Sequence, residues 1–191
     1  MKQPAPLKPK KCGFCREVFQ PARLLQKCCR PACAMDLVER RKAKAGRKAD
    51  QERRQQLKTI SQLEDECRRI AQKIARIRDK DDGCISCHMG PNYRGVWHGS
   101  HYRAHGGCSS LQFHLWNIHK ACEQCNFYKG GNREGYVRGL LVKQGYGRER
   151  LDWLDSQPKS RKFDREYLLR FKQVMGKRMR RAEKRAMETA A

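Results

Sequence analysis

Two cysteine pairs bracket the stretch of sequence that decides the fold. Cys84-Ile-Ser-Cys87 is followed 34 residues later by Cys122-Glu-Gln-Cys125. Two such pairs are typical of a zinc site with four thiolate ligands. Four protein thiolates fill the tetrahedral shell of the ion and leave no position for a reacting water, so zinc here would be structural. We therefore expect zinc to hold residues 84–125 together.

The segment between these pairs carries the chemistry-bearing side chains. It contains Trp97-His98-Gly-Ser100-His101-Tyr102-Arg103, and all six histidines of the chain lie within residues 81–132. Alternation of apolar and polar residues over 96–103 and over 111–115 predicts a β-hairpin. A short helix over about 122–129 would then complete a ββα unit.

A second group of cysteines lies near the N-terminus. Cys12-Gly-Phe-Cys15 and Cys29-Arg-Pro-Ala-Cys33 also have the spacing of a four-thiolate zinc module. Cys28 could replace Cys29 as a ligand. We prefer Cys29 because the following Pro31 suggests a turn that leads into a helix. Cys67 and Cys108 lack partners in the sequence, and we interpret them as packed or incidental thiols.

The charge of the chain points to a polyanionic partner, DNA or RNA. Its 191 residues carry a formal net charge of +24, and only 38% of them are hydrophobic. Residues 81–132 contribute only +1, so the positive charge lies on the flanks. No run reaches the length of a membrane span, and the N-terminus lacks the apolar core of a signal peptide. We expect a cytoplasmic location and no membrane partner.

Helical segments flank the central segment on both sides. Residues 35–80 predict a helical arm whose first half is solvated. Its second half has a 4, 3, 4, 3 apolar stripe, which indicates either packing within its own domain or a dimerising coiled coil. The stripe comprises Leu63, Cys67, Ile70, Ile74 and Ile77. Two short helices over 135–143 and 148–156 and a basic helix from about residue 161 are expected after the core.

These features predict an α+β protein of small zinc-stabilised modules. Residues 1–34 form an N-terminal four-cysteine zinc finger with a disordered start, and residues 35–80 form a basic helical arm or linker. Residues 81–156 form the zinc-bound core with its following helices. Residues 157–191 form a basic C-terminal helix and tail.

The order of the central motifs resembles a known nuclease core. A Cys-x2-Cys pair, a strand with His101, Asn117 five residues before a second Cys-x2-Cys pair, and then Asn126 and Lys129 resemble the zinc-bound HNH, or ββα-metal, core. The resemblance tightens over Cys-Ile-Ser-Cys, His-Tyr-Arg, Asn-Ile-His-Lys and Cys-x2-Cys-Asn-x2-Lys-x-Gly-Asn, preceded by the N-terminal module. From about Cys12 to Ser156 the chain is similar to the lambdoid phage NinG, or Rap recombinase, family.

The resemblance implies a structure-specific endonuclease that cuts branched recombination intermediates such as Holliday junctions and D-loops. Its partners would be branched double-stranded DNA and phage or host recombination proteins, and a symmetric junction cut would favour a homodimer. His101 matches the general base, Asn126 the ligand of a catalytic Mg²⁺ or Mn²⁺, and Asn117 the asparagine that braces the loop. Arg103, Lys120 and Lys129 are expected to contact phosphates.

One position departs from the HNH pattern. Many HNH cores have an aspartate immediately before the base histidine, where this chain has Ser100. His98 could serve as the metal ligand instead, or the DNA phosphate and water could complete the shell. The role of His119 is undecided: it could be a second metal ligand, contact a phosphate, or pack beside the zinc site. The alternatives to a branch-cutting nuclease are a non-catalytic zinc DNA-binding recombination accessory protein and a sequence-specific HNH enzyme.

Overall fold

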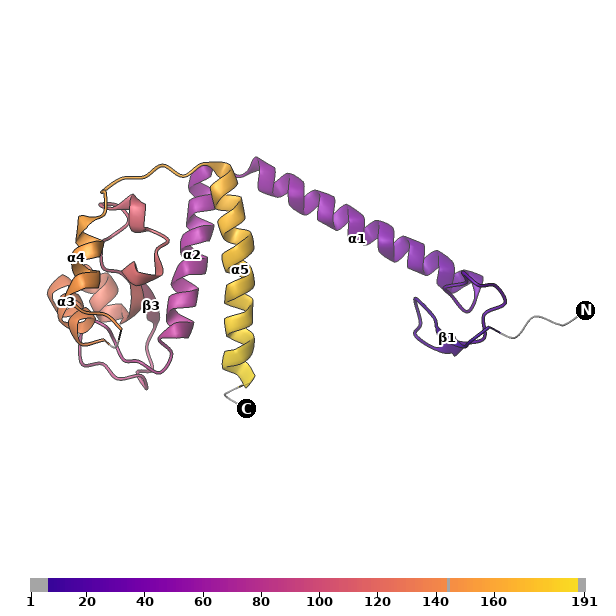
Figure 1. Ribbon diagram of the computed structural model, residues 1–191, viewed down its shortest axis with the longest axis horizontal. Coiled ribbons are helices and arrows are strands. Elements are labelled where there is room, and N and C mark those ends of the chain that lie inside the picture. Colours follow the sequence, from indigo (N-terminus) through magenta and orange to yellow (C-terminus); the bar gives the residue numbers. More distant parts are fainter. Residues whose placement is uncertain (1–6, 144, 189–191) are drawn as a thin grey trace, which may run out of the picture. The chain divides into compact units, whose positions relative to one another are not determined.

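The computed structural model describes residues 7–143 and 145–188 (Figure 1). The predicted α+β class is confirmed, with two small antiparallel sheets among several helices. The chain divides into two compact units, residues 1–58 and 59–191, which we describe separately. The outermost residues of the expected disordered start and basic tail, 1–6 and 189–191, lie outside the described residues. None of the described helices combines the length and the apolar character needed to span a membrane.

The first unit is a cysteine-centred module that leads into a long helix. Strands β1 (Lys10–Lys11) and β2 (Val18–Phe19) pair antiparallel, with Lys10 opposite Phe19. Helix α1 (Pro31–Leu57) begins at a proline, which suits a first helical turn. Cys33 is the single buried residue of α1, so the rest of this helix is solvated, as predicted.

The helix predicted over residues 35–80 is two helices. Helix α2 (Ile60–Arg78) begins after Thr59, whose hydroxyl accepts a hydrogen bond from the Gln62 backbone N–H at 3.2 Å. The Gln62 side chain accepts from the Thr59 backbone N–H at 2.9 Å in return. This capping box starts a new helix without any proline or glycine to mark the boundary. The boundary between the two units therefore falls within the predicted arm, between Lys58 and Thr59. The division into four domains stays a prediction.

The apolar stripe of α2 packs within its own unit. Leu63 and Cys67 are fully buried in a cluster with Phe113, Phe163 and Leu168, which brings α2 against α5 (Arg165–Glu188). The next turns of α2 lie against the sheet, since Ala71 and Ala75 contact Ile118. This confirms the intradomain packing of the stripe; dimerisation stays a prediction. Helix α5 begins at Arg165, later than expected, where the Asp164 carboxylate accepts from the Tyr167 N–H at 2.7 Å.

The central hairpin has a different second strand from the one predicted. Strand β3 (Trp97–His101) pairs antiparallel with β4 (Ile118–Cys122), so that Ser100 lies opposite His119. The prediction of a strand over 111–115 is wrong, because this segment lies among the 3₁₀ turns η1 (Ser109–Leu111) and η2 (Leu115–Asn117). Leu111 and Phe113 alternate because both anchor the loop in the core. The short helix that completes the unit is a π-helix, η3 (Gln124–Tyr128).

Helices α3 (Arg133–Val142) and α4 (Arg148–Ser156) follow close to their predicted positions. These helices and the loop of the hairpin form one apolar core. This core includes Tyr102, Tyr136, Leu140 and Leu154. Two glycines let α3 lie directly on the backbone of the first central cysteine pair. A Cβ on Gly139 would overlap the Ile85 carbonyl oxygen, and one on Gly135 would overlap that of Ser86.

Replacing Gly139 should therefore destabilise the second unit. We expect Gly139→Ala to lower the free energy of unfolding by about 1–3 kcal/mol, the usual cost of overpacking. Gly90→Ala is the matched control, because a Cβ there meets no atom within 4 Å, and it should change stability by less than about 0.5 kcal/mol. Urea unfolding followed by tryptophan fluorescence measures both variants. Equal stability of the two variants would contradict the close approach of α3.

Candidate metal centres and candidate active site

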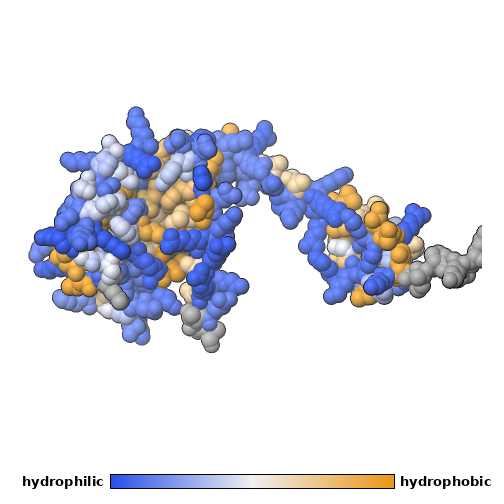
Figure 2. All heavy atoms as spheres, viewed as in Figure 1, coloured by the Kyte–Doolittle hydropathy of each residue, from blue (hydrophilic) through white to orange (hydrophobic). Residues whose placement is uncertain are grey.

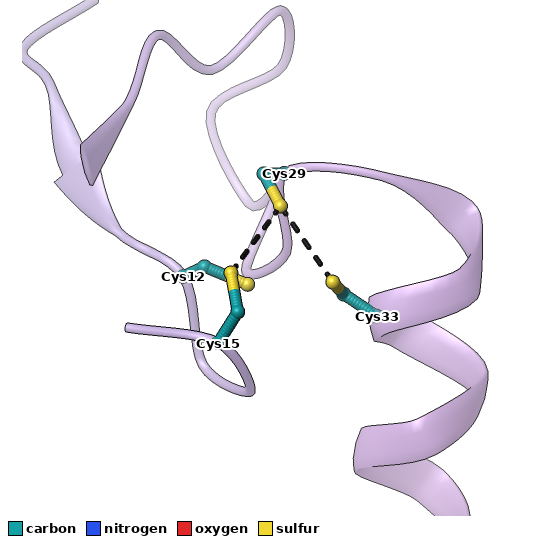
Figure 3. A group of neighbouring side chains, drawn as sticks. All are labelled: Cys12, Cys15, Cys29 and Cys33. Carbon is teal, nitrogen blue, oxygen red and sulfur yellow. Dashed lines mark hydrogen bonds between the residues drawn. The ribbon is translucent and has the colours of Figure 1, made fainter. Parts of the chain in front are cut away.

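The first candidate metal centre joins the two ends of the N-terminal module. The sulfur atoms of Cys12, Cys15, Cys29 and Cys33 all lie within 4.8 Å of one another (Figure 3). Cys29 Sγ lies 3.6 Å from Cys15 Sγ and 3.7 Å from Cys33 Sγ. A tetrahedral zinc ion with Zn–S bonds of about 2.3 Å separates its ligands by about 3.8 Å, so these distances suit zinc. They are far longer than a disulfide bond.

The structure also decides between the two adjacent cysteines. Cys29 belongs to the four-sulfur group and Cys28 does not, so the preference for Cys29 is confirmed. Cys28 is instead a buried thiol of the module core. Arg30 Nε donates a hydrogen bond to Cys33 Sγ at 3.4 Å. A charged donor of this kind stabilises a thiolate and orients the ligand.

The second candidate metal centre joins the hairpin, η3 and the loop that follows α2. Its sulfur atoms belong to Cys84, Cys87, Cys122 and Cys125, again within 4.8 Å of one another, and Cys87 Sγ lies 3.8 Å from Cys122 Sγ. Cys84 Sγ accepts the backbone N–H groups of Ser86 at 3.4 Å and Cys122 at 3.3 Å. Both four-cysteine groups can therefore hold zinc ions, in the ligand sets that the sequence predicts.

A polar cleft of about 260 Å³ lies next to the second centre. Strand β3 contributes His98, Ser100 and His101, η3 contributes Asn126, and the middle of α2 contributes one wall. Gly99 permits this arrangement, because a Cβ there would lie 2.6 Å from Gln72 Cβ. The structure thus brings together three of the predicted site residues, His98 and His101 from β3 and Asn126 from η3.

The contacts of His101 leave one ring nitrogen as a base. Its Nε2 lies 3.0 Å from the Gln112 carbonyl oxygen, an acceptor, so Nε2 carries the proton and donates. The neutral ring then has its lone pair on Nδ1. Burial lowers the pKa of His101 below its ordinary value, outweighing the carbonyl contact that raises it. His101 is therefore neutral at pH 7 and able to accept a proton.

The cleft offers nitrogen and amide oxygen atoms to a cation, and no carboxylate among the described residues lines it. His98 Nε2 and Ser100 Oγ are both buried, and neither has a hydrogen-bond partner within the described part of the chain. His98 and Asn126 line the same cleft, and an imidazole nitrogen without a hydrogen-bond partner and an amide oxygen are atoms that a divalent ion could use as ligands. These donors suit Mn²⁺ better than Mg²⁺, which prefers oxygen ligands.

Asn117 lies outside the cleft and ties its loop together. The side chain is fully buried, and its Oδ1 accepts the Arg103 backbone N–H at 2.8 Å. Its Nδ2 donates to the carbonyls of Arg103 at 3.0 Å and Leu111 at 3.2 Å. This is the bracing geometry that the resemblance implies, and it fixes the backbone that follows His101.

His119 also lies outside the cleft, in the core beneath the sheet. Its ring centroid lies 4.8 Å from that of Tyr146, and its Nδ1 lies 3.2 Å from Tyr136 Oη. Burial lowers the pKa of His119 to about 3, so the ring is neutral. Its buried Nε2 has no hydrogen-bond partner among the described residues, so the side chain packs among tyrosines while its role as a second ligand or a phosphate contact stays a prediction.

The three basic residues expected to contact phosphates differ in exposure. Lys120 is buried, and its Nζ donates to the Lys80 carbonyl at 2.8 Å and lies 4.3 Å from the centre of the Trp97 ring. Arg103 Nη1 donates to the carbonyls at the end of α4, including Leu154 at 2.7 Å. Lys129 is exposed just after η3. Lys129 is thus the one whose charge is presented to solvent near Asn126.

Three polar residues that line the cleft were not among the predicted site residues. Gln72 and Arg76 lie one turn apart on α2, and His105 follows β3 with its ring centroid 6.1 Å from that of His101. The spacing of Gln72 and Arg76 beside the apolar stripe is the only signal that could have indicated a polar surface facing the hairpin.

The fold and these sites define a strongly basic α+β protein with two four-cysteine groups that can hold metal ions and a histidine- and asparagine-lined cleft beside the second. Comparison with known proteins gives the family. Residues 4–186 match the family model described as Bacteriophage Lambda NinG protein, and the chain belongs to this family.

Several curated relatives are also named protein ninG, and the similarity covers most of their length. Protein ninG of Escherichia phage lambda is 31% identical over 160 residues, which cover 74% of this chain and 76% of the relative. Protein ninG of Salmonella phage P22 is 30% identical over 170 residues, covering 80% of this chain and 82% of the relative. No solved structure matches the chain.

The two centres lead to a quantitative prediction about zinc. The purified protein should contain about two zinc ions per chain by elemental analysis, because each centre holds one ion with four thiolates. Cys29→Ser should reduce the content to about one, whereas Cys28→Ser, the adjacent control, should leave it at about two. Loss of zinc in Cys28→Ser with retention in Cys29→Ser would reverse the ligand assignment.

Proposed function

We propose that this protein is a metal-dependent endonuclease of the HNH type. Its substrate would be branched double-stranded DNA, such as Holliday junctions and D-loops, formed during phage recombination in the host cytoplasm. The observation that carries the proposal is the convergence of His98, His101 and Asn126 in one cleft beside a four-cysteine centre. Membership of the NinG family supports it, since the motifs shared with the HNH core lie in the matched region.

The residues of the cleft fit phosphodiester hydrolysis. His101 Nδ1 would take the proton of the attacking water, because Nε2–H is committed to the Gln112 carbonyl. His98 Nε2 and the Asn126 amide oxygen would hold a divalent ion, whose charge would stabilise the pentacovalent phosphorus transition state. Arg76 on α2 and the exposed Lys129 supply positive charge for binding the phosphate.

The distribution of charge supports recognition by shape. The segment 81–132 carries a net charge of only +1, while α1 is solvated along its basic length. Side chains that contact phosphates give affinity without sequence choice. We therefore propose that the basic segments 1–80 and 133–191 bind the phosphates of the DNA arms around the branch. A homodimer or a recombination partner would position two cleavage sites.

One observation favours a second candidate function. The absence of a carboxylate among the described residues of the cleft weakens the oxygen ligand set that Mg²⁺ prefers. A zinc-stabilised DNA-binding protein that assists recombination without cutting would tolerate such a cleft. Mn²⁺-dependent nicking of DNA separates the two candidates.

The direct test is nicking of synthetic Holliday junctions and of linear duplex by the purified chain with Mg²⁺ or Mn²⁺. We expect nicks near the branch point, faster with Mn²⁺, and none in linear duplex. His101→Ala should slow nicking by about 10²–10⁴, the usual contribution of a general base, while junction binding is kept. Asn126→Ala should abolish nicking and Asn126→Asp, which retains an oxygen ligand, should preserve it.

Each alternative has its own outcome. Junction binding without metal-dependent nicking by the intact chain would support the accessory protein. Site-specific cutting of linear duplex would support a sequence-specific HNH enzyme. Zinc content and circular dichroism of the His101→Ala protein ensure that lost nicking reflects chemistry rather than unfolding.

The pH dependence of nicking tests the role of His101 separately. A general base must be unprotonated, so the rate should be constant from pH 7 to 8 and fall as the pH drops through the pKa of His101. Because burial lowers this pKa, the midpoint of the fall should lie below about 6.5. Single-turnover rates at constant ionic strength measure it. A midpoint above pH 7 would exclude a buried, neutral His101 as the base.

A further inference from the structure

A second cavity of the larger unit, separate from the cleft, combines arginines with aromatic rings. It has a volume of about 530 Å³ and lies between the 110–116 loop, α4 and α5. None of its lining residues lines the catalytic cleft. Figure 2 shows an apolar recess beside α5 with hydrophilic residues around its rim. We call this cavity the arginine–aromatic groove; the lining residues used below are Arg150, Arg161, Arg178, Trp116, Tyr146 and Tyr167.

The arginines of the groove are held by rings rather than by carboxylates. The Arg150 guanidinium lies 4.3 Å from the centre of the Trp116 ring and 4.9 Å from that of Tyr146. The Arg161 guanidinium lies 5.5 Å from the centre of the Tyr167 ring. Cation–π contacts fix a guanidinium over a ring face without using its N–H donors. The planar forks therefore stay available for bidentate binding of phosphate.

The charge of the groove has no compensation on its own walls. No carboxylate lines it, and Arg150, Arg161 and Arg178 make no ion pair with any described residue. Arg78, at the end of α2, differs because it pairs with Asp79 at 2.7 Å. Three uncompensated arginines around one recess attract a ligand with several negative charges spaced along it, such as a nucleic-acid strand.

The rings indicate which form of the strand fits. Tyr167 is 37% exposed, and Trp153, which packs on Trp116 and His114 at the groove edge, is also 37% exposed. Aromatic floors with basic rims bind unpaired nucleotides, because every base then offers a π-face for stacking. A duplex keeps its base faces inside its own stack and would leave the apolar recess unused.

We propose that the arginine–aromatic groove binds unpaired nucleotides of a DNA strand, with Arg150, Arg161 and Arg178 on the phosphates and the exposed rings against the bases. The proposal rests on the proposed function in one respect, that a branched substrate would supply unpaired nucleotides next to the branch. Binding itself can be measured without any cleavage.

The first experiment compares two charge-matched double variants of the full chain. Fluorescence anisotropy measures the affinity for labelled oligo(dT) and for a duplex of the same length at moderate salt. Arg150→Gln with Arg161→Gln should weaken oligo(dT) binding by about tenfold, because two phosphate contacts in the groove are lost, with a smaller effect on duplex. Arg40→Gln with Arg47→Gln removes the same charge from exposed positions of α1 and should weaken both DNAs equally.

The second experiment locates the bound strand. Oligo(dT) that carries 5-iododeoxyuridine is crosslinked to the intact protein by light, and the modified peptides are identified by mass spectrometry. We expect crosslinks in the peptides that contain Trp116, Tyr146 or Tyr167. Crosslinks confined to residues 7–58 or to the catalytic cleft would overturn the proposal, as would equal effects of the two double variants on oligo(dT).

Two further results distinguish the occupants and the hypotheses. If the chain sediments as a dimer that the Arg150–Arg161 variant converts to a monomer, the groove is an interface between copies and the nucleotide proposal fails. If the protein nicks branched DNA but binds oligo(dT) no better than duplex through the groove, the proposal for the groove fails and the proposed nuclease function stands. Selective oligo(dT) binding without nicking would support the groove and overturn the nuclease.

Discussion

Each unit contains a group of four cysteines that brings separate segments of the chain to one point, and the rest of the structure is arranged around these two groups. In the first unit the buried residues are cysteines, with Phe14, Phe19 and Leu37 packed against them. In the second unit the four-cysteine group connects segments far apart in the chain: the loop after α2, the end of β4 and η3. An ion with four thiolates contributes folding free energy that a small core cannot supply. The same group also sets the position of Asn126, because Asn126 follows Cys125 and Cys125 lies in one group with Cys122 of β4.

The polar cleft forms at the free edge of a two-stranded sheet. Four consecutive residues of β3, 98–101, line it, although neighbouring side chains of a strand point to opposite faces. This is possible because β3 pairs only with β4 in its sheet, so both faces are accessible from its open edge. Helix α2 closes one side by crossing Gly99, and η3 closes another. The site residues therefore come from β3 and η3, and the four-cysteine group joins η3 to β4, the partner strand of β3.

The sequence predicts what depends on covalent spacing and fails where tertiary packing decides. Both cysteine groups and the choice of Cys29 follow from motif spacing, whereas the resemblance to the HNH core is what indicates the cleft residues His98, His101 and Asn126. The break at Thr59 escaped notice, because a capping box needs no helix breaker. The second strand was misplaced because Leu111 and Phe113 alternate as loop anchors, while every residue of the true strand β4 is buried and shows no alternation. Gln72 and Arg76 join the cleft through helix packing, which a local pattern does not reveal.

The net charge of +24 does not describe one surface. Residues 1–58 contain 17 Lys or Arg and five Asp or Glu, so half of the net charge lies in the first unit, with +7 in residues 1–30 and +4 along α1. Charge of this kind binds any nucleic acid and weakens steeply with salt. In the second unit many basic side chains are instead engaged, as with Arg103 on carbonyls, Arg78 on Asp79 and Lys172 on Glu66. Arg150, Arg161 and Arg178 make no ion pair with a described residue, and in our proposal their position beside aromatic rings is what would select one form of DNA, which charge spread along a helix would not do.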